Sequence, residues 1–190
     1  MIILLAGLVL FLGIHLIKVV APDWRAARIA AMGEGPWKGI YSLVSIVGLV
    51  LIVWGYARAN GTVGFLYTPP EWGRHVAYLL ILLGFISFGF SDLPTGRVKP
   101  LIRNPMLIGT VLWSAGHLFV RGNVVSVLLF GGFLLWAIID WVSVSRRQAA
   151  GTTPLPVPGP VKWDFASIAF GLGLYLIFVF FLHEWLIGIP

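Results

Sequence analysis

The chain has 190 residues, of which 59% are hydrophobic and 11% are charged. A soluble domain is typically about 45–50% apolar and about 25% charged, so this composition excludes an ordinary soluble monomer and predicts a polytopic membrane protein. The formal net charge of +6 is spread over several short connections, which fits loops that face anionic lipid and argues against nucleic-acid binding. The chain contains no cysteine, which excludes disulfides, thiolate ligands and cysteine nucleophiles.

Six apolar runs reach, or fall slightly short of, the length of about 17–25 residues that a membrane-spanning helix needs. They are residues 1–20, 37–57, 75–91, 105–120, 124–144 and 164–187. We therefore expect an all-α integral membrane protein, a bundle of six transmembrane helices that forms a single domain over residues 1–190. The first run lacks a positively charged start and a small-residue cleavage site, which predicts a mature helix rather than a signal peptide.

The first connection, residues 21–36, predicts a short interfacial helix. Pro22 and the acidic residue after it favour a helix start, and Arg25 and Arg28 then fall on one face. A tryptophan in the first turn is typical of a helix that lies in the lipid interface.

The basic residues predict the orientation of the chain. Ten of the 13 Lys and Arg residues lie in connections or helix ends on one side of the predicted bundle. These ten are Lys18, Arg25, Arg28, Lys38, Arg97, Lys99, Arg103, Arg146, Arg147 and Lys162. Because positive loops stay in the cytoplasm, both termini are expected on the non-cytoplasmic side. The connection 146–163 on the cytoplasmic side is rich in proline, which predicts a stiff connector or, alternatively, a strap for docking a partner.

Small residues predict close helix packing in the last run. Ser167 and Gly171 are four residues apart, as are Ala169 and Gly173. This spacing allows the backbone of a neighbouring helix to approach closely.

Ionisable residues at membrane depth are costly and therefore candidates for function. Asp140 lies near the inner end of the fifth run, where it is expected to pair with Arg146, Arg147 or a basic residue of the 97–103 connection. The alternative is a carboxylate that orients a histidine or relays a proton. Two further histidines are interpreted as interfacial imidazoles. They are His75 and His183.

His15 and His117 lie deeper in their runs, and each follows an aromatic residue one helical turn earlier, Phe11 and Trp113 respectively. The adjacent small residues are Gly13 and Gly116. An imidazole, an aromatic ring and a gap in side-chain bulk suit a flat apolar macrocycle, and haem iron is commonly held by histidine. The alternative is that each histidine hydrogen-bonds to a neighbouring helix. The predicted boundaries place the two histidines at depths about 9 Å apart, so ligation of one iron requires offset or tilted helices.

Three stretches carry a resemblance to a known family. FLGIHLIK, RNPMLIGTVLWSAGHLFVRGN and FFLHEWLIGIP resemble the NnrU family, which includes the 15-cis-ζ-carotene isomerases. The resemblance implies haem b with its iron on two histidines, at the positions of His15 and His117, and a bacterial cytoplasmic membrane. It also implies a link to nitrite and nitric oxide respiration. The family usually has a histidine where this chain has Asn104.

Three functions remain open on the sequence. The first is a haem protein that senses or handles nitric oxide or transfers electrons, with Lys18 and, from the first connection, Arg25 and Arg28 as partners of the haem propionates. The second is a haem-dependent cis–trans isomerase of a polyene, whose apolar cleft would include Phe11 and Trp113 and would accept a quinone-like ligand equally well. The third is a cofactor-free membrane helper of a respiratory complex.

Overall fold

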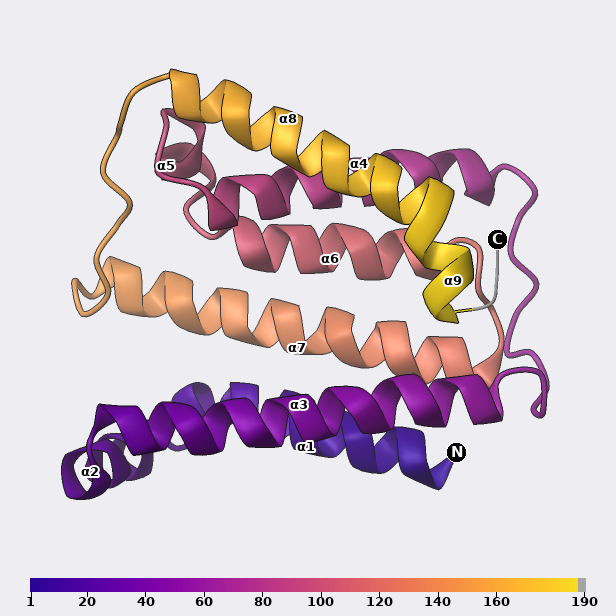
Figure 1. Ribbon diagram of the computed structural model, residues 1–190, viewed down its shortest axis with the longest axis horizontal. Coiled ribbons are helices and arrows are strands. Elements are labelled where there is room, and N and C mark those ends of the chain that lie inside the picture. Colours follow the sequence, from indigo (N-terminus) through magenta and orange to yellow (C-terminus); the bar gives the residue numbers. More distant parts are fainter. Residues whose placement is uncertain (188–190) are drawn as a thin grey trace. The chain divides into compact units, whose positions relative to one another are not determined.

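The computed structural model describes residues 1–187, and every regular element within that range is helical (Figure 1). The contacts between residues divide the chain into two compact units. Unit 1 comprises Met1–Leu66 and Asn123–Gly132, and unit 2 comprises Tyr67–Gly122 and the chain from Phe133 onwards.

Unit 1 contains three complete helices and the start of a fourth. They are α1 (Ile2–Val20), α2 (Pro22–Met32), α3 (Glu34–Ala59) and the first residues of α7 (Val124–Ala149). Unit 2 contains the rest of α7 and the remaining helices. They are α4 (Gly73–Asp92), α5 (Val98–Ile102), α6 (Pro105–Leu118), α8 (Lys162–Ile177), the π-helical turn η1 (Phe178–Leu182) and α9 (His183–Ile187).

In unit 1, α1 and α3 pack antiparallel through glycines that leave no room for a side chain (Figure 1). A Cβ added to Gly7 would lie 2.6 Å from the backbone nitrogen of Ile52, and one added to Gly48 would lie 2.8 Å from the backbone nitrogen of Phe11. Small residues let two helix backbones approach closely, which is a common way to join helices in a membrane. The contact between α1 and α3 is therefore a backbone-to-backbone seam.

In unit 2, α4 is the helix on which both α6 and α8 pack. The Ser87 hydroxyl of α4 donates a hydrogen bond of 2.7 Å to the Pro105 carbonyl at the start of α6. On the other side, a Cβ added to Gly171 of α8 would lie 2.6 Å from the Cα of Ile86. The predicted Ser167–Gly171 packing face is thus confirmed, since Ser167 is also buried.

The second small-residue prediction for the last span is wrong. A Cβ added to Gly173 would meet nothing within 4 Å among the described residues, and Ala169 is exposed. One face of α8 packs on α4, and the spacing of small residues alone does not indicate which face that is.

The start of α8 holds the connection that leads into α5. Asp164 is 6% exposed, and its carboxylate accepts hydrogen bonds from the backbone N–H groups of Arg97, at 2.8 and 2.9 Å, and Val98, at 3.0 Å. A buried carboxylate that accepts several N–H donors has its charge well compensated. This interaction fixes the turn before α5 against the first turn of α8.

Among the described residues, five helices are long and apolar enough to cross a membrane, so the chain is a multi-pass membrane protein, as its composition predicts. They are α1, α3, α4, α7 and the continuous stretch Lys162–Trp185. The remaining predicted span, residues 105–120, is the 14-residue helix α6. At about 1.5 Å per residue it is about 21 Å long, shorter than a hydrocarbon core of about 30 Å.

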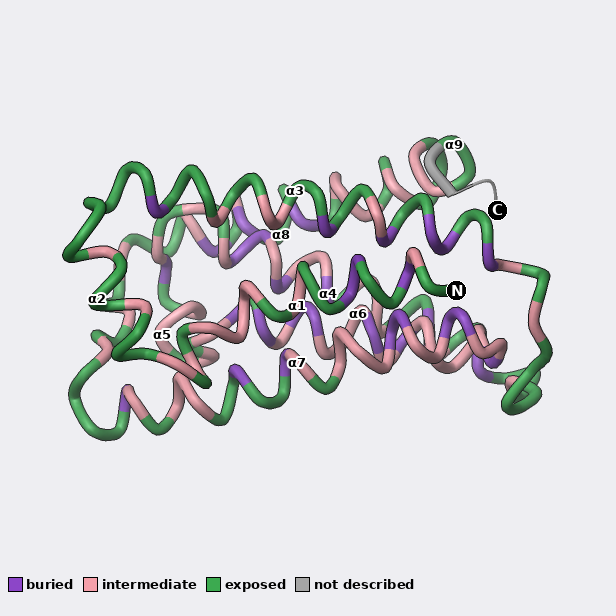
Figure 2. Tube along the Cα trace, turned by 90° about the horizontal axis from the view of Figure 1, so that it is seen from below, coloured by how far each residue is buried: buried purple, intermediate pink, exposed green. Residues whose placement is uncertain are grey.

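The predicted short helix in the first connection is confirmed as α2, which begins at Pro22 and has no buried residue (Figure 2). Its place in the lipid interface stays a prediction. Many of its residues are exposed, as are many apolar side chains of α3. Exposed apolar side chains on long helices are what contact with lipid requires.

Candidate functional site

His15 of α1 is half-buried, and its ring is held in one orientation by the backbone of its own helix. Its Nδ1 lies 2.6 Å from the carbonyl oxygen of Phe11. A carbonyl oxygen can only accept a hydrogen bond, so Nδ1 carries the proton and donates. In the neutral imidazole, Nε2 then carries the acceptor lone pair. This is the tautomer that a metal-ligating histidine adopts when a backbone carbonyl orients it.

Two aromatic rings flank His15. The Phe11 ring centroid is 4.4 Å away, with an interplanar angle of 30°, and the Tyr41 ring of α3 is 5.1 Å away. There is free space next to Gly13, two residues before His15, since a Cβ added there would meet nothing within 4 Å among the described residues. Lys18 follows one turn later and is exposed. The predicted combination of imidazole, aromatic ring and gap is therefore present at His15.

His117 of α6 repeats the same local arrangement. Its Nδ1 lies 2.8 Å from the carbonyl oxygen of Trp113, so Nδ1 again donates and Nε2 again carries the lone pair. The Trp113 ring centroid is 5.0 Å from the imidazole. The predicted gap at Gly116 is wrong, however, because a Cβ there would lie 2.8 Å from Ile81 of α4. That glycine serves the packing of α6 on α4.

His183 also belongs to this neighbourhood, which its interpretation as an interfacial imidazole did not anticipate. Its ring centroid is 6.4 Å from that of His117, with an interplanar angle of 25°. His183 follows the π-helical turn η1 directly. Such turns add a residue to the helical register and are frequent at functional sites. The phenylalanines of η1 give no sequence signal for this change of register.

Tyr67 is a second residue that sequence reasoning missed. Its hydroxyl donates hydrogen bonds to the carbonyl oxygens of Leu118 and Arg121, the latter at 3.2 Å. Leu118 is the last residue of α6 and follows His117 directly, and Arg121 lies in the connection after the helix. Tyr67 is therefore a positioning residue for the helix end that carries the imidazole.

We expect Tyr67→Phe to lower the free energy of unfolding by about 0.5–1.5 kcal/mol, the usual contribution of a hydrogen bond. Burial raises the pKa of the Tyr67 phenol. The folded state then favours the protonated phenol. The contribution of this preference to the free energy of unfolding is fully present below the unfolded pKa of about 10 and is lost as the pH rises through the folded pKa. Melting curves of the purified protein between pH 8 and 11 measure both effects.

The control for this experiment is Tyr78→Phe, since Tyr78 is an exposed tyrosine of the same unit. The control should melt like the wild type up to pH 10. If Tyr67→Phe keeps the full alkaline loss of stability, the assigned role of the Tyr67 hydroxyl is wrong.

The two arginines predicted as propionate partners each lie over an indole ring. Arg25 lies 5.9 Å from the centre of the Trp37 ring of α3, and Arg28 lies 5.4 Å from that of Trp24. Arg25 thus contacts the start of α3, whereas Arg28 contacts a tryptophan of its own helix, α2.

The remaining polar predictions can also be located. The pairing of Asp140 with Arg147 is confirmed, with 3.9 Å between the carboxylate oxygen and Nη2. Asn104, at the family's usual histidine position, exchanges two hydrogen bonds of 3.2 Å with the Gln148 side-chain amide. The exposed His75 lies in the first turn of α4, as an interfacial histidine should. Asn104 therefore has a structural role that needs no imidazole.

Within residues 1–187, no group of three or more His, Cys, Asp or Glu side chains could hold a metal ion. The structure groups His15 with Phe11 and Tyr41 in unit 1, and His117 with Trp113 and His183 in unit 2. Joint ligation of one iron by His15 and His117 stays a prediction.

Comparison with known proteins gives one match. A family model described as "NnrU protein" matches residues 3–190, nearly the whole chain. No curated protein and no solved structure matches the chain.

Proposed function

The chain belongs to the NnrU family, and on that premise we propose that it is a haem b protein of a bacterial cytoplasmic membrane, with His15 and His117 as the iron ligands. The observation that carries this proposal is the hydrogen bond that both imidazoles make to their own helix. Each donates its Nδ1 proton to the carbonyl four residues earlier, which leaves Nε2 with the lone pair that iron needs.

The surroundings of both histidines fit a porphyrin chemically. Phe11 and Trp113 stand one turn before their histidines and offer apolar ring faces. Neutral imidazole is the state that ligates a metal. The residues present therefore match the donor set of a haem with two histidine ligands.

The propionates of a haem need cations at one end of its site. Lys18 is the first candidate, because it lies on α1 one turn beyond His15. Arg25 and Arg28 are the second, because they follow on α2 at the same end of α1. Charge-assisted hydrogen bonds from these side chains would orient the macrocycle without contributing to iron ligation.

We further propose six crossings with both termini outside the cytoplasm. The support is that α6, although short, follows α4 antiparallel over most of its length. Its start is hydrogen-bonded to Ser87, and its last turn lies against Ala77 and Ile81. A short helix can still cross a membrane when the polar residues at its ends reach the interface. The ten basic residues then lie on the cytoplasmic side, as the positive-inside rule requires.

When bound, ferrous haem b supplies electron transfer and a binding position for nitric oxide. His15 and His117 would hold the iron, and such a haem would bind nitric oxide only where one of the two imidazoles gives way. The Nδ1 hydrogen bonds orient both imidazoles. The role in nitric oxide handling or electron transfer thus depends on how easily His15 or His117 is displaced.

One experiment tests this role against isomerisation. The purified protein, loaded with haem and reduced with dithionite, should change its absorption spectrum on addition of nitric oxide. Membranes that contain the protein should leave a tri-cis ζ-carotene unchanged under the same reducing conditions. An isomerised product would favour the haem-dependent isomerase. A colourless, iron-free preparation that copurifies with a respiratory complex would favour the cofactor-free helper.

A further inference from the structure

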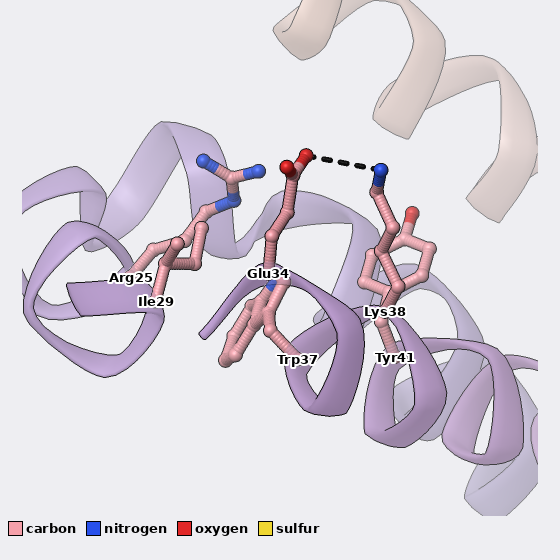
Figure 3. Close-up of a pocket in the computed structure, with 6 residues that line it drawn as sticks. All are labelled: Arg25, Ile29, Glu34, Trp37, Lys38 and Tyr41. Carbon is pink, nitrogen blue, oxygen red and sulfur yellow. Dashed lines mark ion pairs between the residues drawn. The ribbon is translucent and has the colours of Figure 1, made fainter. Parts of the chain in front are cut away.

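A small pocket lies in unit 1 where α2 meets the start of α3 (Figure 3). Its volume is about 190 Å³. Both helices contribute to its lining, which consists of Arg25, Ile29, Glu34, Trp37, Lys38 and Tyr41. Charged and apolar side chains are therefore combined in one recess at the end of a membrane-spanning helix.

The polar part of the pocket is dominated by positive charge. Glu34 and Lys38 form an ion pair of 3.0 Å, and both side chains are 71% exposed. Figure 3 shows the Arg25 guanidinium on one side of the Glu34 carboxylate and the Lys38 ammonium on the other, with all three charged ends turned the same way. Two cations and one anion leave a formal charge of +1 on the lining. An exposed ion pair contributes little energy, so Lys38 can exchange partners easily.

The apolar part of the pocket includes aromatic side chains of α3. Trp37 is 6% exposed and forms a wall, with the Arg25 guanidinium 5.9 Å from its ring centre. Exposed apolar side chains follow on the flank of α3 next to Lys38, with Ile46 at 60% and Leu49 at 48%. A ligand that displaces the Glu34 carboxylate from Lys38 would have its polar end on the two cations and its apolar end along this flank.

We propose that this pocket binds the phosphate of an anionic glycerophospholipid. Arg25 and Lys38 hold the phosphate, and the acyl chains follow the exposed apolar flank of α3 next to Lys38, along Ile46 and Leu49. The net positive lining favours a lipid with a net negative charge over a zwitterionic one, and basic sites of this kind near a membrane interface recognise anionic headgroups. A free inorganic phosphate would use the two cations but none of the apolar surface. This inference does not depend on haem.

The test is lipid retention by the full-length protein, measured by native mass spectrometry after extraction from nanodiscs. The nanodiscs contain phosphatidylcholine mixed with phosphatidylglycerol or with phosphatidylethanolamine. We expect one phosphatidylglycerol to stay bound per chain, in preference to both zwitterionic lipids. Equal retention of all three would overturn the proposal, as would displacement of the lipid by millimolar inorganic phosphate.

Variants assign the retained lipid to the pocket. Removing one cation near a membrane surface costs about fivefold in affinity, so Arg25→Gln with Lys38→Gln should weaken phosphatidylglycerol retention about 25-fold. The matched control is Arg146→Gln with Lys162→Gln, which removes the same charge at two exposed positions elsewhere. Equal losses of phosphatidylglycerol retention in the two double variants would mean that the lipid responds only to the overall charge of the protein. That result would contradict the proposal.

A third variant keeps the test decisive if the double variant folds poorly. Glu34→Gln removes the carboxylate that competes with the phosphate for Lys38, so it should strengthen phosphatidylglycerol retention. Weaker retention in Glu34→Gln would contradict the proposal.

Loss of the haem absorption band in the Arg25 and Lys38 variant, with lipid retention unchanged, would assign these cations to a propionate instead. Loss of the lipid with the haem band intact separates the two sites.

Discussion

Alanine in place of His15 or His117 is expected to abolish the six-coordinate haem spectrum of the purified protein. On the proposed ligation, each substitution would remove one Nε2 ligand, which would change the spin state of the iron and lower the affinity for haem. The expected readings are a shifted or absent Soret band and less haem per chain. Changes of 10- to 100-fold in affinity already follow from disturbing a ligand's support, so loss of the ligand itself should exceed about 100-fold.

Two other histidines serve as controls for this experiment. His75 is exposed in the first turn of α4, so His75→Ala should keep the wild-type spectrum. His183 lies 6.4 Å from the His117 ring, so His183→Ala should alter the band position slightly and retain the haem. Loss of haem from His183→Ala together with an unchanged His15→Ala would move the second ligand to His183 and refute the assignment of His15.

Gly7→Ala is expected to destabilise the protein more than any other single methyl addition in α1. The added Cβ would lie 2.6 Å from the backbone nitrogen of Ile52 and 2.9 Å from the carbonyl oxygen of Gly48. Backbone atoms cannot swing aside as a side chain can, so α1 and α3 must separate. Overpacking of this kind costs about 1–3 kcal/mol. Unfolding in detergent mixtures, followed by circular dichroism, measures the change.

Gly13→Ala is the matched control, because the same methyl group on the same helix meets nothing within 4 Å among the described residues. It should leave the stability unchanged or raise it slightly, since alanine is the better helix former. Equal destabilisation by the two substitutions would contradict the backbone-to-backbone seam between α1 and α3.

The sequence was sufficient where a local pattern dictates local structure. Apolar length identified the long helices, and Pro22 identified the start of α2, because both signals act within a few residues. The partner of Asp140 could also be predicted, because Arg147 lies close along the same helix and a buried charge needs a counter-charge. The Nδ1 hydrogen bonds of the two histidines also stay within one helical turn, although the alternative weighed from the sequence placed the partner of each histidine on a neighbouring helix.

The sequence was insufficient where two segments distant in the chain must meet. The contact of His183 with His117, and the hydrogen bonds from Tyr67 to the end of α6, join residues separated by 50 or more positions. No periodicity encodes such pairs. Gly116 and Gly13 read alike in sequence, yet one packs on α4 and the other is open, because only the tertiary contact distinguishes them. The pocket lined by Arg25 and Lys38 comes from two neighbouring helices, yet it too forms only through the packing of α2 on α3.

The most direct test of haem ligation is the absorption spectrum of the purified wild-type protein, recorded oxidised and then reduced with dithionite. His15 and His117 as joint ligands predict one haem b per chain, with a sharp Soret band and the split visible bands of a low-spin, six-coordinate ferrous iron. A protein that stays colourless after incubation with haem, or that binds it only as a high-spin species unaffected by loss of either histidine, would contradict that ligation.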